Sequence, residues 1–126
     1  MPVASRAQVA AFLHVFKSCF RLDRFSVKDR QKNRQALIAL AMDPAERRDA
    51  LLGLQPDDYV AGPKPDDTDD TREVWEFGRT IGTTEVYIKV RVVQDPKKKN
   101  VHHAVVWSFH PAEFRMKYPL RGGSGS

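Results

Sequence analysis

The stretch EVYIKVRVV, residues 85–93, restricts the fold more than any other part of the chain because its apolar and polar side chains alternate. One parity is aliphatic throughout and comprises Val86, Ile88, Val90 and Val92. The other parity carries charged and phenolic side chains, namely Glu85, Tyr87, Lys89 and Arg91. A period of two is typical of a β-strand with one buried face. The stretch predicts a sheet with a packed face and a polar face, and its cations suggest that the polar face binds an anion.

Two further strands are predicted, one on each side of this stretch. VWEF (74–77) precedes it across the turn GTT (82–84), and HHAVVWSF (102–109) follows it across DPKKKN (95–100). Short connections between consecutive strands predict an antiparallel meander. Uninterrupted alternation places Trp107 and Phe109 on the packed face. It adds Glu76, His102 and His110 to the polar face.

Helical patterns occupy the first half of the chain and can cover the packed face. Ser5 and Gln8 have the spacing of a capping box, and an apolar helix face follows. A second helix is predicted within residues 28–42, with three side chains turned inward, Leu37, Leu40 and Ala41. A third helix begins at the N-cap signal DPAE (43–46). The predicted fold class is α+β, with an antiparallel sheet packed on N-terminal helices.

Two segments have the composition of loops or linkers. Residues 57–71 are predicted to be a loop, and the run DDTDD (66–70) is either a solvated linker or a flap that shields the polar face electrostatically. GGSGS (122–126) is interpreted as a flexible linker outside the fold. Residues 1–121 are then expected to form a single domain.

Composition restricts the compartment and the partners. The 126 residues carry a net charge of +5 at pH 7, which favours a polyanion or an acidic protein as partner. Cys19 is the only cysteine, so an intrachain disulfide or a Cys-based zinc site is not expected, and the reducing cytoplasm is the expected compartment. The sequence contains no run of eighteen apolar residues, and no membrane partner is expected.

The predicted polar face has the chemistry needed to bind and cleave a phosphodiester. Lys and Arg can neutralise a developing phosphorane, while His, Glu or Tyr can transfer protons. RNA cleavage through the substrate's own 2′-OH needs no metal. Adjacent His102 and His103 point to opposite faces of a strand, so neither a metal nor another cofactor is expected. Cys19 lies near the apolar face of the first helix and is interpreted as a core residue.

Four segments resemble the motility quorum-sensing regulator (MqsR) toxins of bacterial toxin–antitoxin systems: LLGLQPDDYVAGP, REVWEFG, EVYIKVRVV and VVWSFHPAE. The resemblance covers roughly residues 45–113. It implies a RelE-like fold, a metal-independent endoribonuclease that cuts mRNA, and a cognate antitoxin encoded by an adjacent gene. The resemblance also assigns the family's catalytic tyrosine to Tyr87 and a family lysine to Lys89.

The chain departs from the family pattern at three positions. Glu76 replaces a glutamine and His110 replaces a lysine, and both can titrate nearer neutral pH than the residues they replace. Ala61 stands where the family has a lysine, with Lys64 nearby. These departures leave open which residues act as general acid and general base.

The hypothesis drawn from the sequence is an endoribonuclease site. Lys89 and Arg91 bind the scissile phosphate, and Tyr87 orients it or donates a proton. His110 is the general acid and Glu76 the general base. Two further residues are expected to contact RNA, Lys64 and His102. The alternatives are a non-catalytic RNA- or protein-binding module that uses the same face, and an antitoxin or adaptor whose acidic loop engages a basic partner.

Overall fold

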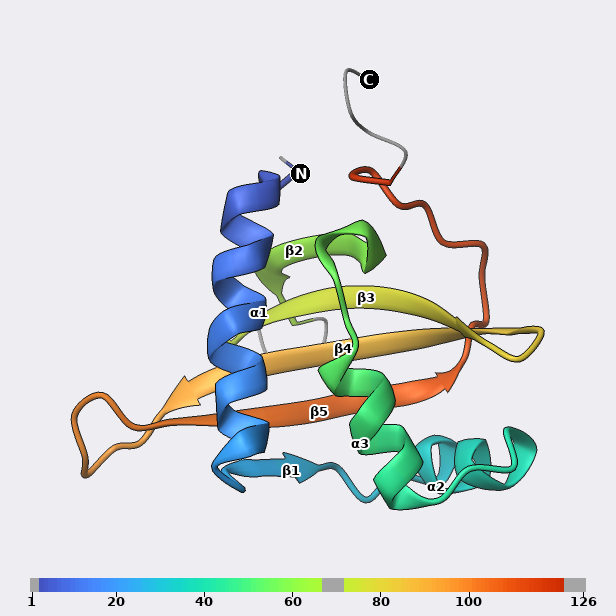
Figure 1. Ribbon diagram of the computed structural model, residues 1–126, viewed down its shortest axis with the longest axis horizontal. Coiled ribbons are helices and arrows are strands. Elements are labelled where there is room, and N and C mark those ends of the chain that lie inside the picture. Colours follow the sequence, from blue (N-terminus) through green and yellow to red (C-terminus); the bar gives the residue numbers. More distant parts are fainter. Residues whose placement is uncertain (1–2, 67–71, 122–126) are drawn as a thin grey trace.

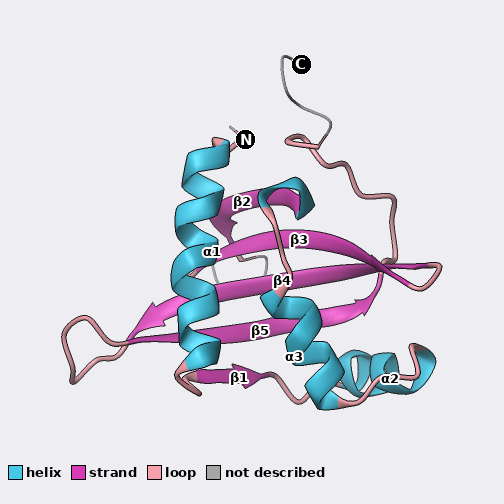
Figure 2. Ribbon diagram, in the orientation of Figure 1, coloured by secondary structure: helices cyan, strands magenta, loops and turns pink. Residues whose placement is uncertain are grey.

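The computed structural model of the protein describes residues 3–66 and 72–121, so the predicted linker GGSGS (122–126) lies outside the described residues. In chain order the elements are α1 (Arg6–Arg21), β1 (Phe25–Val27), α2 (Gln31–Ala39), α3 (Pro44–Leu52), the 3₁₀ turn η1 (Pro56–Asp58), β2 (Tyr59–Pro65), β3 (Glu73–Ile81), β4 (Thr84–Gln94) and β5 (His102–Pro111). The strands form one sheet in the order β1-β5-β4-β3-β2 (Figure 2). β2 to β5 are antiparallel, and β1 pairs in parallel with β5. The predicted α+β class is confirmed.

Helices α1 and α3 cover one face of the sheet (Figure 1). α1 begins at the predicted capping box of Ser5 and Gln8, and α3 begins at a capping box formed by Asp43 and Glu46. Phe12 of α1 stacks on Trp75 of β3 with the ring centroids 4.4 Å apart. No helix in residues 3–66 and 72–121 is long and apolar enough to cross a membrane.

The packed face of β4 is the one that its alternation predicts. Val86, Ile88 and Val90 are fully buried and belong to the hydrophobic core that the helices cover. Full burial of one such aliphatic side chain stabilises the fold by about 1.5–3 kcal/mol. The opposite parity of β4 faces away from α1 and α3, and this second side is called the outer face below.

The structure corrects the expected limits of several elements. α2 spans nine residues rather than the fifteen of the predicted segment, and its buried residues are Asn33 and Ala36. Leu37 and Leu40 are only half-buried, and Ala41 is exposed with φ of 52° after the helix has ended. β1 and β2 were not predicted. β1 has only three residues, too few to show alternation. β2 lies in the segment predicted to be a loop, because its glycine and two prolines interrupt the alternation typical of a strand.

A β-bulge in β5 changes which side chains share a face. Lys89 pairs with Ser108, but the next residue, Val90, pairs with Val106, so Trp107 is an extra residue. Before the bulge, therefore, the even-numbered residues of β5 face the helices, and after it Phe109 does. The prediction that Trp107 and Phe109 share the packed face is wrong. Trp107 lies on the outer face, with Lys28 Nζ 4.9 Å from its ring centroid.

The side chain of Asn33 in α2 holds this bulge in place. Its Oδ1 accepts from the backbone N–H of Phe109 at 3.0 Å, and its Nδ2 donates to the carbonyl of Trp107 at 3.0 Å. Nδ2 also donates to the carbonyl of Lys28 at 3.0 Å. β1 pairs with β5 only as far as Val106, so Asn33 takes over the edge of β5 where β1 ends. The amide acts as a short substitute for a neighbouring strand.

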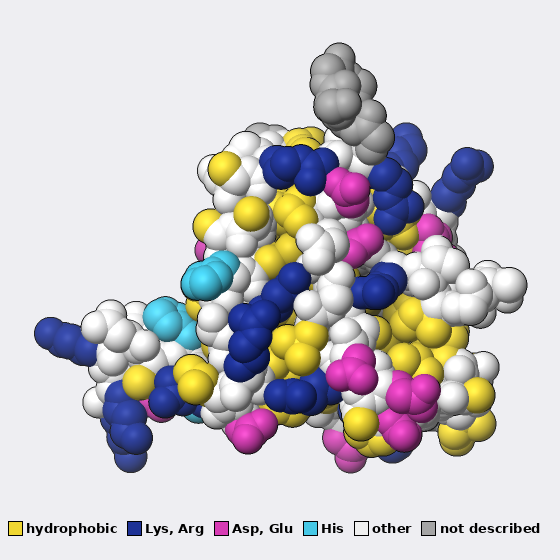
Figure 3. Space-filling view, in the orientation of Figure 1, with side chains coloured by type: hydrophobic (Ala, Val, Ile, Leu, Met, Phe, Trp, Pro, Cys, Tyr) yellow, Lys and Arg dark blue, Asp and Glu magenta, His cyan; other side chains and the backbone are white. Residues whose placement is uncertain are grey.

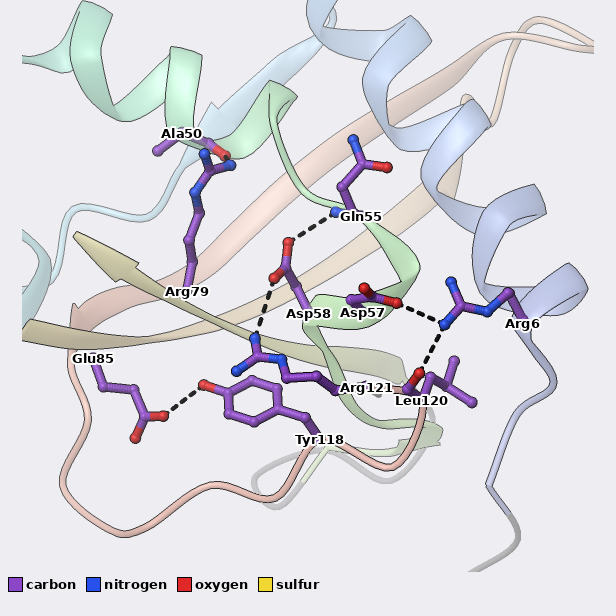
Figure 4. A network of polar contacts seen from close by, with 10 residues as sticks. All are labelled: Arg6, Ala50, Gln55, Asp57, Asp58, Arg79, Glu85, Tyr118, Leu120 and Arg121. Atoms are coloured by element: carbon purple, nitrogen blue, oxygen red, sulfur yellow. Dashed lines mark hydrogen bonds and ion pairs between the residues drawn. The ribbon is translucent and has the colours of Figure 1, made fainter. Parts of the chain in front are cut away.

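The segment after β5 runs past the β3–β4 turn and ends close to the N-terminus of α1 (Figure 1). Tyr118 donates to Glu85 of β4 at 2.7 Å, and Arg6 of α1 donates to the carbonyl of Leu120 at 2.7 Å (Figure 4). A Cβ at Gly78 would clash with the Tyr118 hydroxyl and with the buried Met116 side chain. This glycine lets the segment lie directly on the outer face of β3.

Ile88→Asp is expected to abolish cooperative unfolding near room temperature. An unpaired charge in the core costs a large part of the roughly 5–15 kcal/mol that stabilises a domain. Ile38→Asp is the matched control, because Ile38 is 82% exposed and should lose less than about 1 kcal/mol. Thermal melts followed by circular dichroism measure both variants. A folded Ile88→Asp protein would contradict the assignment of this face to the core.

Candidate active site

Four of the predicted site residues meet on the outer face of three adjacent strands. Glu76 of β3 is the partner of Lys89 in β4, and Tyr87 is the partner of His110 in β5. The ring centroids of Tyr87 and His110 are 5.5 Å apart. Ser108 is the partner of Lys89 and accepts from Arg30 Nη1 at 2.8 Å. The neighbouring registers therefore place a carboxylate, a phenol, an ammonium and an imidazole side by side.

A chain of charged contacts links Tyr87, Glu76 and Lys64. The Tyr87 hydroxyl donates to Oε2 of Glu76, and Lys64 Nζ of β2 lies 2.7 Å from Oε1 of the same carboxylate. Both oxygens of Glu76 therefore have a partner, and the side chain is only 10% exposed. The lysine and the phenol thus share one carboxylate, and the hydrogen bond to Oε2 fixes the orientation of the phenol hydroxyl. Sequence reasoning placed Lys64 in the site without this contact.

Lys89 is held by the first acid of the DDTDD run. Its Nζ lies 3.1 Å from Oδ1 of Asp66, whose side chain is 1% exposed, while the Lys89 side chain is 16% exposed. The backbone N–H of Asp66 donates to the carbonyl of Arg72 at 2.9 Å, which joins the two ends of the acidic segment. Asp66 is thus buried at the site rather than solvated, and residues 67–70 of the run lie outside the described residues.

His110 is oriented by one hydrogen bond to the backbone. Its Nδ1 donates to the carbonyl of Pro111 at 2.9 Å. A carbonyl can only accept, so Nδ1 carries a proton, and in the neutral ring Nε2 is the atom that can accept one. A hollow of about 330 Å³ between α2 and the end of β5 borders the imidazole. Nε2 is therefore the ring atom that stays available to accept or donate a proton.

Most of this network is shielded from solvent. Glu76 is 8% exposed, Tyr87 9% and His110 6%. Phe114 makes an edge-to-face contact with Tyr87, with the ring centroids 5.6 Å apart, while Phe114 itself is 56% exposed to solvent. The segment after β5 thus borders the site as well as fastening the fold. Burial and the hydrogen bond to Glu85 raise the pKa of Tyr118, so this phenol stays neutral at physiological pH.

Two predicted contact residues lie elsewhere. His102 is the partner of Gln94 on the helix-covered side of β5, where it borders a small hollow beside α1. The prediction that it joins Tyr87 and Lys89 is wrong, because alternation was carried through a bulge that reverses it. Arg91 does lie on the outer face, but it borders a separate hollow next to Trp107.

Sequence reasoning missed four residues near the site, namely Lys28, Arg30, Arg72 and Trp107. Lys28 and Arg30 come from the connection between β1 and α2, so their approach depends on a parallel strand pair that no local pattern predicts. Trp107 depends on the bulge. Arg72 lies just before β3, where its carbonyl accepts from the backbone N–H of Asp66 after β2, a strand whose sequence has the composition of a loop.

The described residues offer neither a metal site nor a reactive thiol. No group of three or more His, Cys, Asp or Glu side chains within residues 3–66 and 72–121 is arranged to hold a metal ion. Cys19 is buried in the core as predicted, and burial raises the pKa of its thiol, which disfavours a nucleophilic thiolate. Ala61 pairs with Glu76 in the register of β2 and β3 and contributes no charge.

Comparisons with protein-family models, with curated proteins and with solved structures found no match to this chain.

Among the described residues, the face covered by α1 and α3 carries no patch of uniform charge that would suggest a different binding site (Figure 3). Figure 3 shows that basic side chains there are interspersed with acidic and hydrophobic ones over α1 and α3. The outer face of the sheet, with its contiguous titratable groups, is the better candidate.

The Lys64–Glu76 contact should be measurable in a double-mutant cycle. Lys64→Met leaves a buried carboxylate with fewer partners and is expected to cost about 1–3 kcal/mol of unfolding free energy. In the Glu76→Gln background the same change should cost much less, which gives a coupling of about 0.5–3 kcal/mol. Lys97→Met at the exposed hairpin tip is the control and should cost almost nothing. Urea unfolding curves measure all four proteins, and zero coupling would contradict the contact.

Proposed function

We propose that the protein is a metal-independent endoribonuclease that cleaves mRNA, and that it acts as the toxin of a type II toxin–antitoxin system. The observation that carries the proposal is the contact of Tyr87 with Glu76 and His110 beside the ammonium of Lys89. Two titratable groups flank one phenol, and a cation stands next to them. Acid–base cleavage of RNA needs this set of groups and no added metal.

The cleavage step uses the 2′-OH of the substrate. Its oxygen forms a bond to phosphorus while the bond from phosphorus to the 5′-oxygen breaks. Tyr87 takes up the 2′-OH proton as its own proton passes to Glu76, which is the base. His110 in its charged form donates the Nε2 proton to the departing 5′-oxygen. Lys89 stabilises the charge that develops on the phosphate, and Lys64 and Arg91 bind the strand.

The role as a toxin rests on the resemblance of residues 45–113 to the MqsR toxins. The substrate is mRNA, and the protein partner is an antitoxin encoded by an adjacent gene, in the cytoplasm of a bacterium. A site in which Asp66 and Glu76 already pair with two lysines also fits control by a partner, because a change in those pairs alters the charge offered to RNA.

A second candidate is a non-catalytic RNA-binding module on the same face. It is favoured by the low exposure of Glu76, Tyr87 and His110, since buried and satisfied polar groups can serve stability alone. The two candidates differ in outcome. The binding module predicts affinity for RNA without cleavage.

Purified protein is expected to cleave single-stranded RNA in the presence of EDTA and to leave a 2′,3′-cyclic phosphate or a 3′-phosphate end. A 2′-deoxy or 2′-O-methyl group at the cleavage position should block the reaction, because the nucleophile is then missing. Gel analysis of end-labelled oligonucleotides measures both results. Activity that disappears with the chelator would overturn the mechanism, and binding without cleavage would support the second candidate.

His110→Ala is expected to lower the cleavage rate by about 10²- to 10⁴-fold, because a general acid is lost. RNA affinity should change little, and His110→Gln, which preserves most of the volume, should show the same loss if folding of the alanine variant is impaired. His102→Ala is the matched control, since this histidine of β5 lies on the opposite face. The rate is measured in single turnover, and growth arrest on induction in bacteria should follow it. A His110→Ala protein with nearly full activity would transfer the role of acid to another group.

A further inference from the structure

A second hollow opens on the outer face beside the site, with a volume of about 280 Å³. It is lined by residues from four segments: Lys28, Arg72, Arg91, Val93, Val105 and Trp107. Three of them are cations, and no acidic side chain of the described part of the chain lines the hollow. A concave surface with this charge attracts an anion and repels a cation.

Two of the three cations of this hollow contact the indole of Trp107. Lys28 Nζ lies 4.9 Å and the Arg72 guanidinium 5.4 Å from its ring centroid. Both distances are within the range of a cation–π interaction. The interaction restricts the movement of two long side chains, which lowers the entropy cost of binding an anion.

Arg91 supplies an unsatisfied donor at the same place. Its Nε is buried and has no hydrogen-bond partner within residues 3–66 and 72–121, and the same is true of Nε1 of Trp107. Buried donors are nearly always satisfied in folded proteins, so a pair of them at one cationic hollow calls for a ligand that accepts hydrogen bonds. Phosphate oxygens accept from a guanidinium in two parallel bonds.

We propose that Lys28, Arg72 and Arg91 form a subsite for the phosphodiester next to the scissile one, with Trp107 as the residue that positions the cations. Arg91 is two residues from Lys89 on the same face of β4, a separation of about 6.8 Å along a strand. This is comparable with the spacing of neighbouring phosphates in an extended single strand. The subsite rests on the proposed function and adds to it a phosphate contact that fixes the register of the RNA.

Salt dependence of RNA binding tests the subsite. The probe is a fully 2′-O-methylated RNA oligonucleotide, which binds without being cleaved. Loss of one phosphate contact should reduce the slope of log affinity against log salt by about 0.7 for a single strand. Arg91→Met and Lys28→Ala should each show this reduction, and Lys28 is exposed, so its removal leaves the fold intact. Arg21→Ala, which removes an exposed charge at the end of α1 on the helix side, should leave the slope unchanged.

Neutral methylphosphonate linkages placed singly along the same oligonucleotide locate the contact. One linkage next to the cleavage position should weaken binding to the wild-type protein and have no further effect on Arg91→Met. Trp107→Leu should weaken binding without removing a charge, so affinity falls while the salt slope changes less than in Arg91→Met. Unchanged slopes in Arg91→Met and Lys28→Ala would overturn the subsite and assign the cations to another anionic partner, such as an acidic peptide. Binding is measured without cleavage, so a protein that binds in this register yet never cuts RNA would refute the endoribonuclease and leave the subsite standing.

Discussion

The extra residue at Trp107 and the amide of Asn33 that holds it determine how the polar face is composed. In an antiparallel strand with strict alternation, Ala104 and Val106 facing the helices would require His110 to face the helices too and Phe109 to face away from them. The bulge removes this conflict, because Ala104 and Val106 face the helices before it and Phe109 faces them after it. Asn33 stabilises the bulge because its amide pairs with the backbone N–H of Phe109 and the carbonyl of Trp107, which have no strand partner at this edge. His110 reaches Tyr87 as a result.

The charges of the candidate site are balanced inside the protein. Lys64 pairs with Glu76 and Lys89 pairs with Asp66, so two acids offset two bases at low exposure. Buried pairs of this kind contribute little net stability, because desolvation offsets most of their attraction, but removing one partner is costly. Beside Trp107, three cations line a second hollow, and no acid of the described part of the chain lines it with them. We therefore propose that the shielded network transfers protons and that the cationic hollow attracts the RNA.

The segment after β5 connects the site to the rest of the fold. It begins two residues after His110, places Phe114 against Tyr87, and then crosses the outer face at Gly78 to reach η1 and α1. Arg121 lies over the ring of Tyr118 at 3.7 Å and 3.4 Å from Asp58. The exposed ion pairs among these contacts are weak individually, whereas the buried Met116 and the hydrogen bond of Tyr118 fix the path of the segment. The extension is therefore part of the wall of the site.

Local chemistry in the sequence was enough to predict the elements with strong periodicity or caps. The alternation of residues 85–93 predicted which face of β4 is buried, Ser5 and Asp43 marked the starts of α1 and α3, and three of the five strands were found. Parity also predicted that Glu76, Tyr87, Lys89 and His110 share one face, although His110 reaches that face only because of the bulge. Only the tertiary structure decided the rest. A bulge, a parallel edge strand of three residues and a strand rich in Gly and Pro leave no periodic signal, because their stability comes from partners distant in sequence. For that reason His102 was misplaced, and Asn33, Trp107 and the cationic hollow could not be found before the strands were assembled.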